Sequence, residues 1–132
     1  MSERQTLGRD GEAWAAAYLR AHGLVIETAN WRPTGGALAP FARGEIDLVA
    51  RDGATLVFVE VRSRHGAPGR AEESVTPAKQ RRLLTLAQAY LATYDLPEDR
   101  VDWRIDVVAL CYGRAGSEPS VNWLRGAVEA EQ

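Results

Sequence analysis

The hydrophobic positions of this 132-residue chain follow two different periods. Two segments repeat apolar residues every three or four positions, which is typical of helices with one buried face. They run from about Thr6 to His22 and from Thr76 to about Tyr94. Thr76 and Pro77 suit the start of the second helix, as cap residue and first-turn proline. Gly11 falls on the apolar stripe of the first helix and would let that helix approach a sheet closely.

Shorter apolar runs, rich in Val, Leu, Ile and Phe, predict β-strands. We expect strands over 24–29, 44–50, 56–64, 101–112 and 121–128, with loops over 31–43, 65–75 and 113–119. The resulting order, α-β-β-β-α-β-β, predicts an α/β protein with a mixed central sheet flanked by helices. The length suits a single domain over residues 1–132, in which the acidic residues 129–132 form a frayed tail.

Composition narrows the class of protein. No run of eighteen apolar residues occurs, so we expect no contact with a membrane through a spanning helix. The N-terminus lacks the apolar stretch of a signal peptide, and the single cysteine, Cys111, forms no internal disulfide. These features predict a cytoplasmic protein. The net charge of −2 excludes a surface that is basic throughout, but it is compatible with a local basic patch.

The basic residues are almost all arginine. Fifteen of the sixteen are Arg, and Lys79 is the single lysine. This preference indicates a coding bias toward Arg, so an arginine in a place that would suit lysine could reflect drift. Lys79 is then a candidate for a position where arginine would not serve.

Two carboxylates interrupt strands that otherwise read as buried. Asp47 lies in the strand at 44–50, and Glu60 lies among Val and Phe in the next strand. Desolvating a carboxylate is costly unless a partner or a metal compensates for it. A hairpin turn at 53–54 places Asp47 opposite Glu60, whereas a turn at 52–53 places Glu45 opposite Glu60 and Asp47 on the diagonal.

In either register the two carboxylates share one face, at a separation that suits a shared Mg²⁺. The alternative is a structural salt bridge between Asp47 and an arginine such as Arg62. Glu45 could replace Asp47 as a ligand if the register differs. Glu12, at the border of the first helix's apolar stripe, could point along the sheet toward these acids or lie exposed in water.

Several motifs together carry a resemblance to a known family. They are Gly8-Arg9-Asp10-Gly11-Glu12, Asn30-Trp31-Arg32, Gly44-Glu45-Ile46-Asp47-Leu48, Val57-Phe58-Val59-Glu60-Val61-Arg62 and Lys79-Gln80-Arg81-Arg82. Over roughly residues 7–110 the chain resembles the bacterial YraN-like family. That family resembles the PD-(D/E)xK nuclease superfamily, which includes the Holliday-junction resolvases. The resemblance implies a restriction-endonuclease-like core and a metal-dependent endonuclease that hydrolyses DNA phosphodiesters, at branched or recombination structures.

The resemblance also implies roles for individual residues. Asp47 and Glu60 would hold Mg²⁺ (or Mn²⁺), with the Val61 carbonyl as a further ligand. Glu12 would complete the metal site or orient a water molecule.

The chain departs from the superfamily pattern at Arg62, where most relatives have lysine. Arginine cannot act as a general base, although it can bind a phosphate with two hydrogen bonds. Either Arg62 acts electrostatically, or Lys79 reaches the site from the second helix. Lys79 could equally be an ordinary solvent-facing residue.

The basic residues near these motifs indicate nucleic acid as the partner, with DNA as the expected form. The candidates are Arg62, Arg64, Arg70, Lys79, Arg81 and Arg82. Two functions compete: a metal-dependent endonuclease, and a non-catalytic nucleic-acid-binding module on a nuclease-like fold. The acids favour the enzyme, whereas Arg62 favours the binding module. A homodimer would suit the comparison with junction resolvases.

Overall fold

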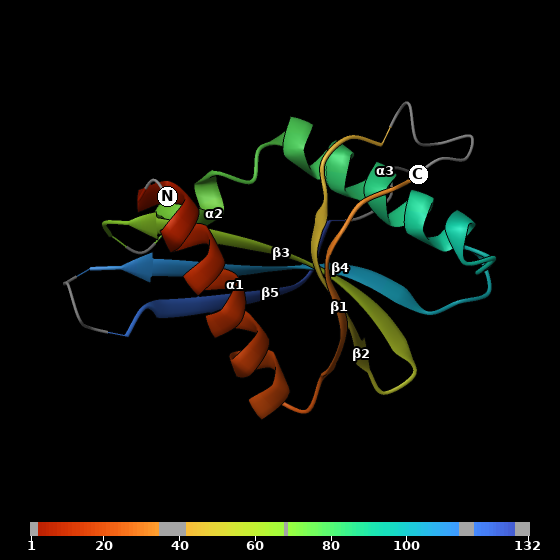
Figure 1. The fold of residues 1–132 in the computed structure, drawn as a ribbon, viewed down its shortest axis with the longest axis horizontal. Helices are drawn as coiled ribbons and strands as arrows, with labels where there is room; N and C mark the ends of the chain where they lie inside the picture. The colour runs from red at the N-terminus through yellow and green to blue at the C-terminus, as the bar shows by residue number, and fades with distance from the viewer. Residues whose placement is uncertain (1–2, 35–41, 68, 114–117, 129–132) are drawn as a thin grey trace.

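The computed structural model describes residues 3–34, 42–67, 69–113 and 118–128, with side chains from residue 10 onward. Its helices are α1 (Glu3–Ala21), α2 (Arg70–Glu73) and α3 (Pro77–Thr93). Its strands are β1 (Val25–Trp31), β2 (Ile46–Asp52), β3 (Thr55–His65), β4 (Trp103–Tyr112) and β5 (Ser120–Val128). Figure 1 shows the strands side by side in one twisted sheet. α1 crosses in front of the strands, and α3 lies apart from α1, at the upper right of the view. The predicted α/β class and mixed sheet are confirmed.

The five strands lie in the order β1-β2-β3-β4-β5. All neighbours are antiparallel except β3 and β4, which run parallel. A parallel pair needs a long crossover connection, and α3 lies within that connection. The arrangement places β3 at the centre of the sheet, so that residues along β3 are enclosed by strands on both sides.

Alternating residues of β3 contribute to two separate cores. Leu56 and Phe58 pack with α3, whereas Val57 and Val59 pack with α1. Because successive side chains in a strand point to opposite faces, the two helices cover opposite faces of the sheet. Glu60 continues the Leu56 and Phe58 series and therefore belongs to the face covered by α3.

Two local features confirm the predictions made for the helix start at Thr76 and for Gly11. Thr76 caps α3 as predicted, since its Oγ1 accepts a hydrogen bond from the Lys79 N–H at 3.2 Å. Gly11 is buried where α1 crosses β3, and a Cβ atom at this position would overlap Ser63 Oγ. The predicted close approach of α1 to the sheet therefore depends on glycine.

Several boundaries differ from the prediction. β2 lies two residues later than expected, β4 begins two residues later and α1 begins three residues earlier. The segment 65–75 was expected to be a loop, but residues 70–73 form the single-turn helix α2, because Ala71 buries its side chain against Ala109 and Cys111. One turn is too short to show a periodic pattern. β1 also extends two residues further than expected, to Trp31, whose ring packs on the α3 core. The predicted tail at 129–132, and most of the predicted loops at 31–43 and 113–119, lie outside the described residues.

Candidate functional site

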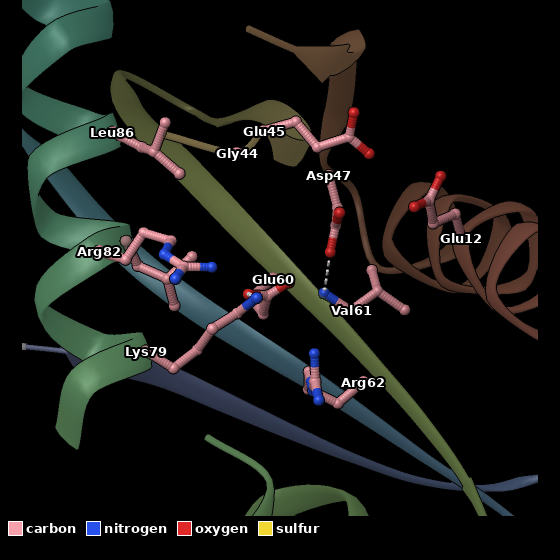
Figure 2. A pocket seen from close by; sticks show the side chains of 11 residues that line it. Glu12, Gly44, Glu45, Asp47, Glu60, Val61, Arg62, Lys79, Arg82 and Leu86 are labelled. Atoms are coloured by element: carbon pink, nitrogen blue, oxygen red, sulfur yellow. Dashed lines mark hydrogen bonds and ion pairs between the residues drawn. The ribbon is translucent and has the colours of Figure 1, made fainter. Parts of the chain in front are cut away.

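A cavity of about 260 Å³ opens between β2, β3, α3 and the first half of α1. Its lining combines four carboxylates, three cationic side chains and four other residues: Glu12, Gly44, Glu45, Asp47, Glu60, Val61, Arg62, Lys79, Arg82, Leu83 and Leu86. Figure 2 shows the acids of β2 and α1 on one side, and Lys79 and Arg82 reaching in from α3 on the other. The cavity therefore presents negative and positive groups next to each other.

The β2–β3 hairpin decides the register of the two strand carboxylates. Asp52 pairs with Thr55, so the turn is Gly53-Ala54, and Gly53 has the positive φ of 59° that such a turn favours. Continuing the register from the Leu48–Val59 pair places Asp47 opposite Glu60. The register that brings Asp47 and Glu60 face to face is therefore the observed one.

Three carboxylates form a compact group. One oxygen from each of Glu12, Glu45 and Asp47 lies within 4.8 Å of the others. Ile46 packs with the α3 core, whereas Leu48 packs with the α1 core, so strict alternation breaks at Asp47. Glu45 nevertheless joins Asp47 in this group rather than replacing it, and the sequence suggested only the replacement.

The surroundings of Asp47 disfavour its charged form. Its Oδ2 accepts a hydrogen bond from the Val61 N–H at 2.8 Å, which favours the charged form. Burial, together with the adjacent Glu60 carboxylate and more weakly Glu12, outweighs that bond and raises the pKa of Asp47 to about 9. The site therefore binds a proton at neutral pH when no cation offsets its negative charge.

Glu60 is buried, with only 4 % of its surface exposed. Its Oε2 accepts no hydrogen bond among the residues that the structure describes, but Lys79 Nζ lies 3.4 Å away. The Lys79 side chain is 27 % exposed, so it is not the fully solvent-facing residue that the sequence left open. The Thr76 cap fixes the backbone of Lys79, and α3 thereby aims an ammonium group at the centre of β3 (Figure 2).

Arg62 also lines the cavity, but its direction differs from that of Lys79. Its Nε donates to Ser74 Oγ at 2.7 Å, just after α2. Arg62 forms no ion pair with Asp47 among the residues described, so the predicted alternative of a structural salt bridge receives no support. Arg82 completes the basic side of the cavity.

The other predicted residues lie near the cavity or outside it. Val61 lines it, and the ligand role predicted for its carbonyl stays a prediction. Arg64, Arg70 and Arg81 are exposed and do not line it. Their predicted contacts with nucleic acid stay predictions as well.

Two residues that sequence reasoning missed support the site from outside. Asn30 Nδ2 donates to Glu12 Oε2 and to Glu45 Oε1, each at 3.0 Å. Ser74 holds Arg62. The motif Asn30-Trp31-Arg32 drew attention to Asn30 without indicating its role, and nothing in the sequence marked Ser74.

One further strand carboxylate has a purely structural environment. Asp106 is fully buried and accepts hydrogen bonds from the Arg104 side chain, the Trp123 indole and the Gly126 N–H. These donors satisfy both of its oxygens, so the Asp106 carboxylate has a structural role. Cys111 is a buried free thiol.

The donor set suits a hard divalent cation. Carboxylate oxygens are the ligands that Mg²⁺ prefers, and two ligands at about 2.1 Å from one ion lie at most about 4.2 Å apart. Among three ligands of one ion at most one pair can lie opposite each other, and neighbouring ligands lie about 3 Å apart. The three oxygens, within 4.8 Å of one another, would therefore draw together by up to about 2 Å on binding an ion. Glu60 lines the same cavity, where its Oε2 has the Lys79 ammonium as a charged neighbour at 3.4 Å. Glu12, Glu45 and Asp47 could therefore hold a metal ion.

The fold and the cavity define an α/β protein whose core is compatible with a nuclease-like architecture and whose site is rich in acids. The chain belongs to the family described as "Uncharacterised protein family UPF0102", whose model matches residues 11–110. This finding confirms the resemblance to the YraN-like family. The matched range contains the whole lining of the cavity. No helix of the described residues is long and apolar enough to cross a membrane.

Individual relatives agree along nearly their whole length. The chain is 47 % identical to a UPF0102 protein of Roseiflexus castenholzii over 131 residues, covering 98 % of each chain. It is 45 % identical to one of Methylococcus capsulatus, covering 98 % of this chain and 96 % of the relative. A relative from Desulfitobacterium hafniense is 40 % identical and is covered to 99 %.

Proposed function

We propose that this protein is a divalent-metal-dependent phosphodiesterase that acts as an endonuclease on DNA. The observation that carries the proposal is the division of one cavity into an acidic side and a basic side. Glu12, Glu45 and Asp47 offer cation ligands, while Lys79 and Arg82 offer positive charge a short distance away. A phosphodiester at a metal centre needs both kinds of group, because its oxygens carry negative charge that increases during hydrolysis.

The residues divide the chemistry among them. A bound Mg²⁺ or Mn²⁺ would supply charge neutralisation and lower the pKa of a water molecule. Glu60, buried beside Lys79, keeps the Lys79 ammonium directed into the cavity. Lys79 and Arg82 then contact the phosphate oxygens from the α3 side. Arg62, fixed by Ser74, presents its remaining guanidinium N–H groups at the end of the cavity nearest α2.

A cleavage and gel-shift panel tests this proposal. Labelled duplex, single-stranded, flap and four-way-junction DNA are incubated with Mg²⁺ or Mn²⁺. The panel compares the wild type with Asp47→Asn, which keeps the shape of the side chain, and with Asp99→Asn, an exposed control. We expect cutting by the wild type and the control, and none by Asp47→Asn. Equal gel shifts without cutting in all three proteins would overturn the endonuclease and leave DNA binding.

A second candidate function, a non-catalytic nucleic-acid-binding module, is favoured by one observation. The strand position that holds lysine in most relatives of the superfamily is Arg62, and its Nε is already committed to Ser74. Arg62→Lys separates the two candidates. A large gain in cleavage would identify the natural chain as a binding module on a nuclease-like fold. No gain in a protein that already cuts would show that Lys79 and Arg62 together suffice.

A further inference from the structure

Asn30 has an unusual backbone conformation at the end of β1. Its φ of 54° lies in the left-handed region, although it is not a glycine. Such a conformation is uncommon for residues with a side chain, and asparagine is among the few that adopt it readily. A conformation of this kind persists where the surrounding structure enforces it.

The side chain of Asn30 joins two acids from different parts of the fold. Its Nδ2 donates one hydrogen bond to Glu12 Oε2 on α1 and one to Glu45 Oε1 just before β2, each at 3.0 Å. Arg32, two residues further along, donates its Nε to Glu45 Oε2 at 3.0 Å. The end of β1 therefore holds both oxygens of Glu45 and one of Glu12.

Trp31 anchors this strand end in the core. Its ring centre lies 5.1 Å from that of Tyr90, and its indole N–H donates to the Tyr94 hydroxyl at 3.2 Å. Trp31 lies between Asn30 and Arg32 in the chain, so its packing holds the backbone from which both side chains reach the acids.

We propose that Asn30 is a positioning residue that holds Glu12 and Glu45 at the spacing needed to bind a divalent cation. Two neighbouring carboxylates repel each other, and a shared donor reduces that repulsion while fixing both side chains. Each carboxylate oxygen has more than one lone pair, so accepting from Asn30 leaves capacity for a metal. The inference rests on the metal-binding part of the proposed function. Supports of this kind typically contribute about 10- to 100-fold in metal affinity.

Asn30→Gly tests the inference, because glycine accepts the positive φ while the amide is removed. The control is Asp95→Gly, since Asp95 has φ 53° and lies after α3, away from the cavity. Mn²⁺ binding is measured by electron paramagnetic resonance, and the Tm is measured without metal. We expect Asn30→Gly to weaken Mn²⁺ binding by about 10- to 100-fold with little change in Tm, and the control to bind like the wild type. Equal affinity in Asn30→Gly and wild type would overturn the inference alone, whereas a wild type that binds no Mn²⁺ would overturn the metal site itself.

If Asn30→Gly fails to fold, nuclear magnetic resonance of the wild-type protein tests the same inference. The side-chain amide resonances of Asn30 should shift on titration with Mg²⁺, because the two carboxylates that they contact become ligands. The amide of Gln88 is the internal control, since it donates to Glu98 at 3.2 Å and lies outside the cavity. An Asn30 signal that stays unchanged while Mg²⁺ saturates the protein would contradict the role proposed for this residue.

Discussion

Lys79 Nζ lies 3.4 Å from Glu60 Oε2, and this contact joins the first turn of α3 to the centre of β3. The lysine expected two residues after Glu60 on the strand is Arg62, which turns toward Ser74. The cation beside Glu60 therefore comes from α3, as the Lys79 ammonium, and not from the neighbouring strand position, Arg62. The single lysine of the chain occupies this place.

Replacing Lys79 with methionine should lower the single-turnover rate on a DNA that the wild type cuts by roughly 100-fold or more, the loss typical when one group that stabilises developing charge is removed. The same change should tighten Mn²⁺ binding, because a positive charge near the acids is gone. Arg100→Met, an exposed change after α3 and outside the cavity lining, is the control and should alter neither quantity. A rate that survives in Lys79→Met would assign the phosphate contact to Arg62 or Arg82.

Asp47→Asn should stabilise the metal-free protein in a pH-dependent way. The pKa of Asp47 is about 9 in the folded protein, above its ordinary value of 3.8, so the folded state holds the proton more tightly. Stability is therefore lost as the pH rises from about 4 to 9, and asparagine avoids that loss. At pH 8 with EDTA we expect a gain of up to roughly 5 kcal/mol, because pH 8 lies about four units above the ordinary pKa and each unit contributes about 1.4 kcal/mol. At about pH 3, below both pKa values, the gain should nearly vanish. A gain that is equal at both pH values would contradict the prediction.

Metal binding should release a proton below pH 9. Because Asp47 is protonated at neutral pH in the metal-free site, a cation has to displace that proton. The apparent affinity for Mn²⁺ should increase up to tenfold per pH unit between about pH 6 and pH 9. Calorimetry in two buffers of different ionisation enthalpy measures the released protons directly. Affinity that stays constant over this range would mean that Asp47 is already ionised or is not a ligand.

The sequence predicted the fold well where burial has a clear period. The apolar stripe of α3 reports one buried face. The continuous apolar run of β3 reports a strand that is buried on both faces, and the structure divides its residues between two cores. The four-residue helix α2 had no such signal, because its position depends on Ala71 meeting Ala109 and Cys111 across the chain. Contacts between distant segments are not visible as a local pattern.

The same distinction applies to the candidate site. Asp47 and Glu60 could be recognised because a carboxylate among strand valines is unusual in itself. Asn30 could not, since its left-handed backbone and its two bonds exist only when α1, β1 and the start of β2 come together. Which of Arg62 and Lys79 lies beside Glu60 likewise depends on how α3 packs on the sheet, and the sequence does not show this.

Gly11 and Ser63 offer a test of how α1 is placed, and with it Glu12. A methyl group at Gly11 would overlap Ser63 Oγ, so Gly11→Ala should destabilise the protein by about 1–3 kcal/mol. Ser63 Oγ is buried and has no hydrogen-bond partner among the described residues, so Ser63→Ala should be neutral or stabilising.

In the double variant the remaining neighbours of the new methyl group, the β-carbon of residue 63 and Leu110 Cδ1, lie at an ordinary contact distance of 3.5 Å. In the Ser63→Ala background the added methyl group should meet no overlap and gain about 1 kcal/mol of helix propensity. Urea denaturation of the four proteins should then give a coupling energy of about 2–4 kcal/mol between the two positions. Ala13→Gly, on the exposed side of α1, measures the propensity contribution alone. Gly11→Ala by itself should also weaken Mn²⁺ binding, because it pushes Glu12 away from Glu45 and Asp47. Additive effects of the two substitutions would show that α1 does not depend on this contact for its place on the sheet.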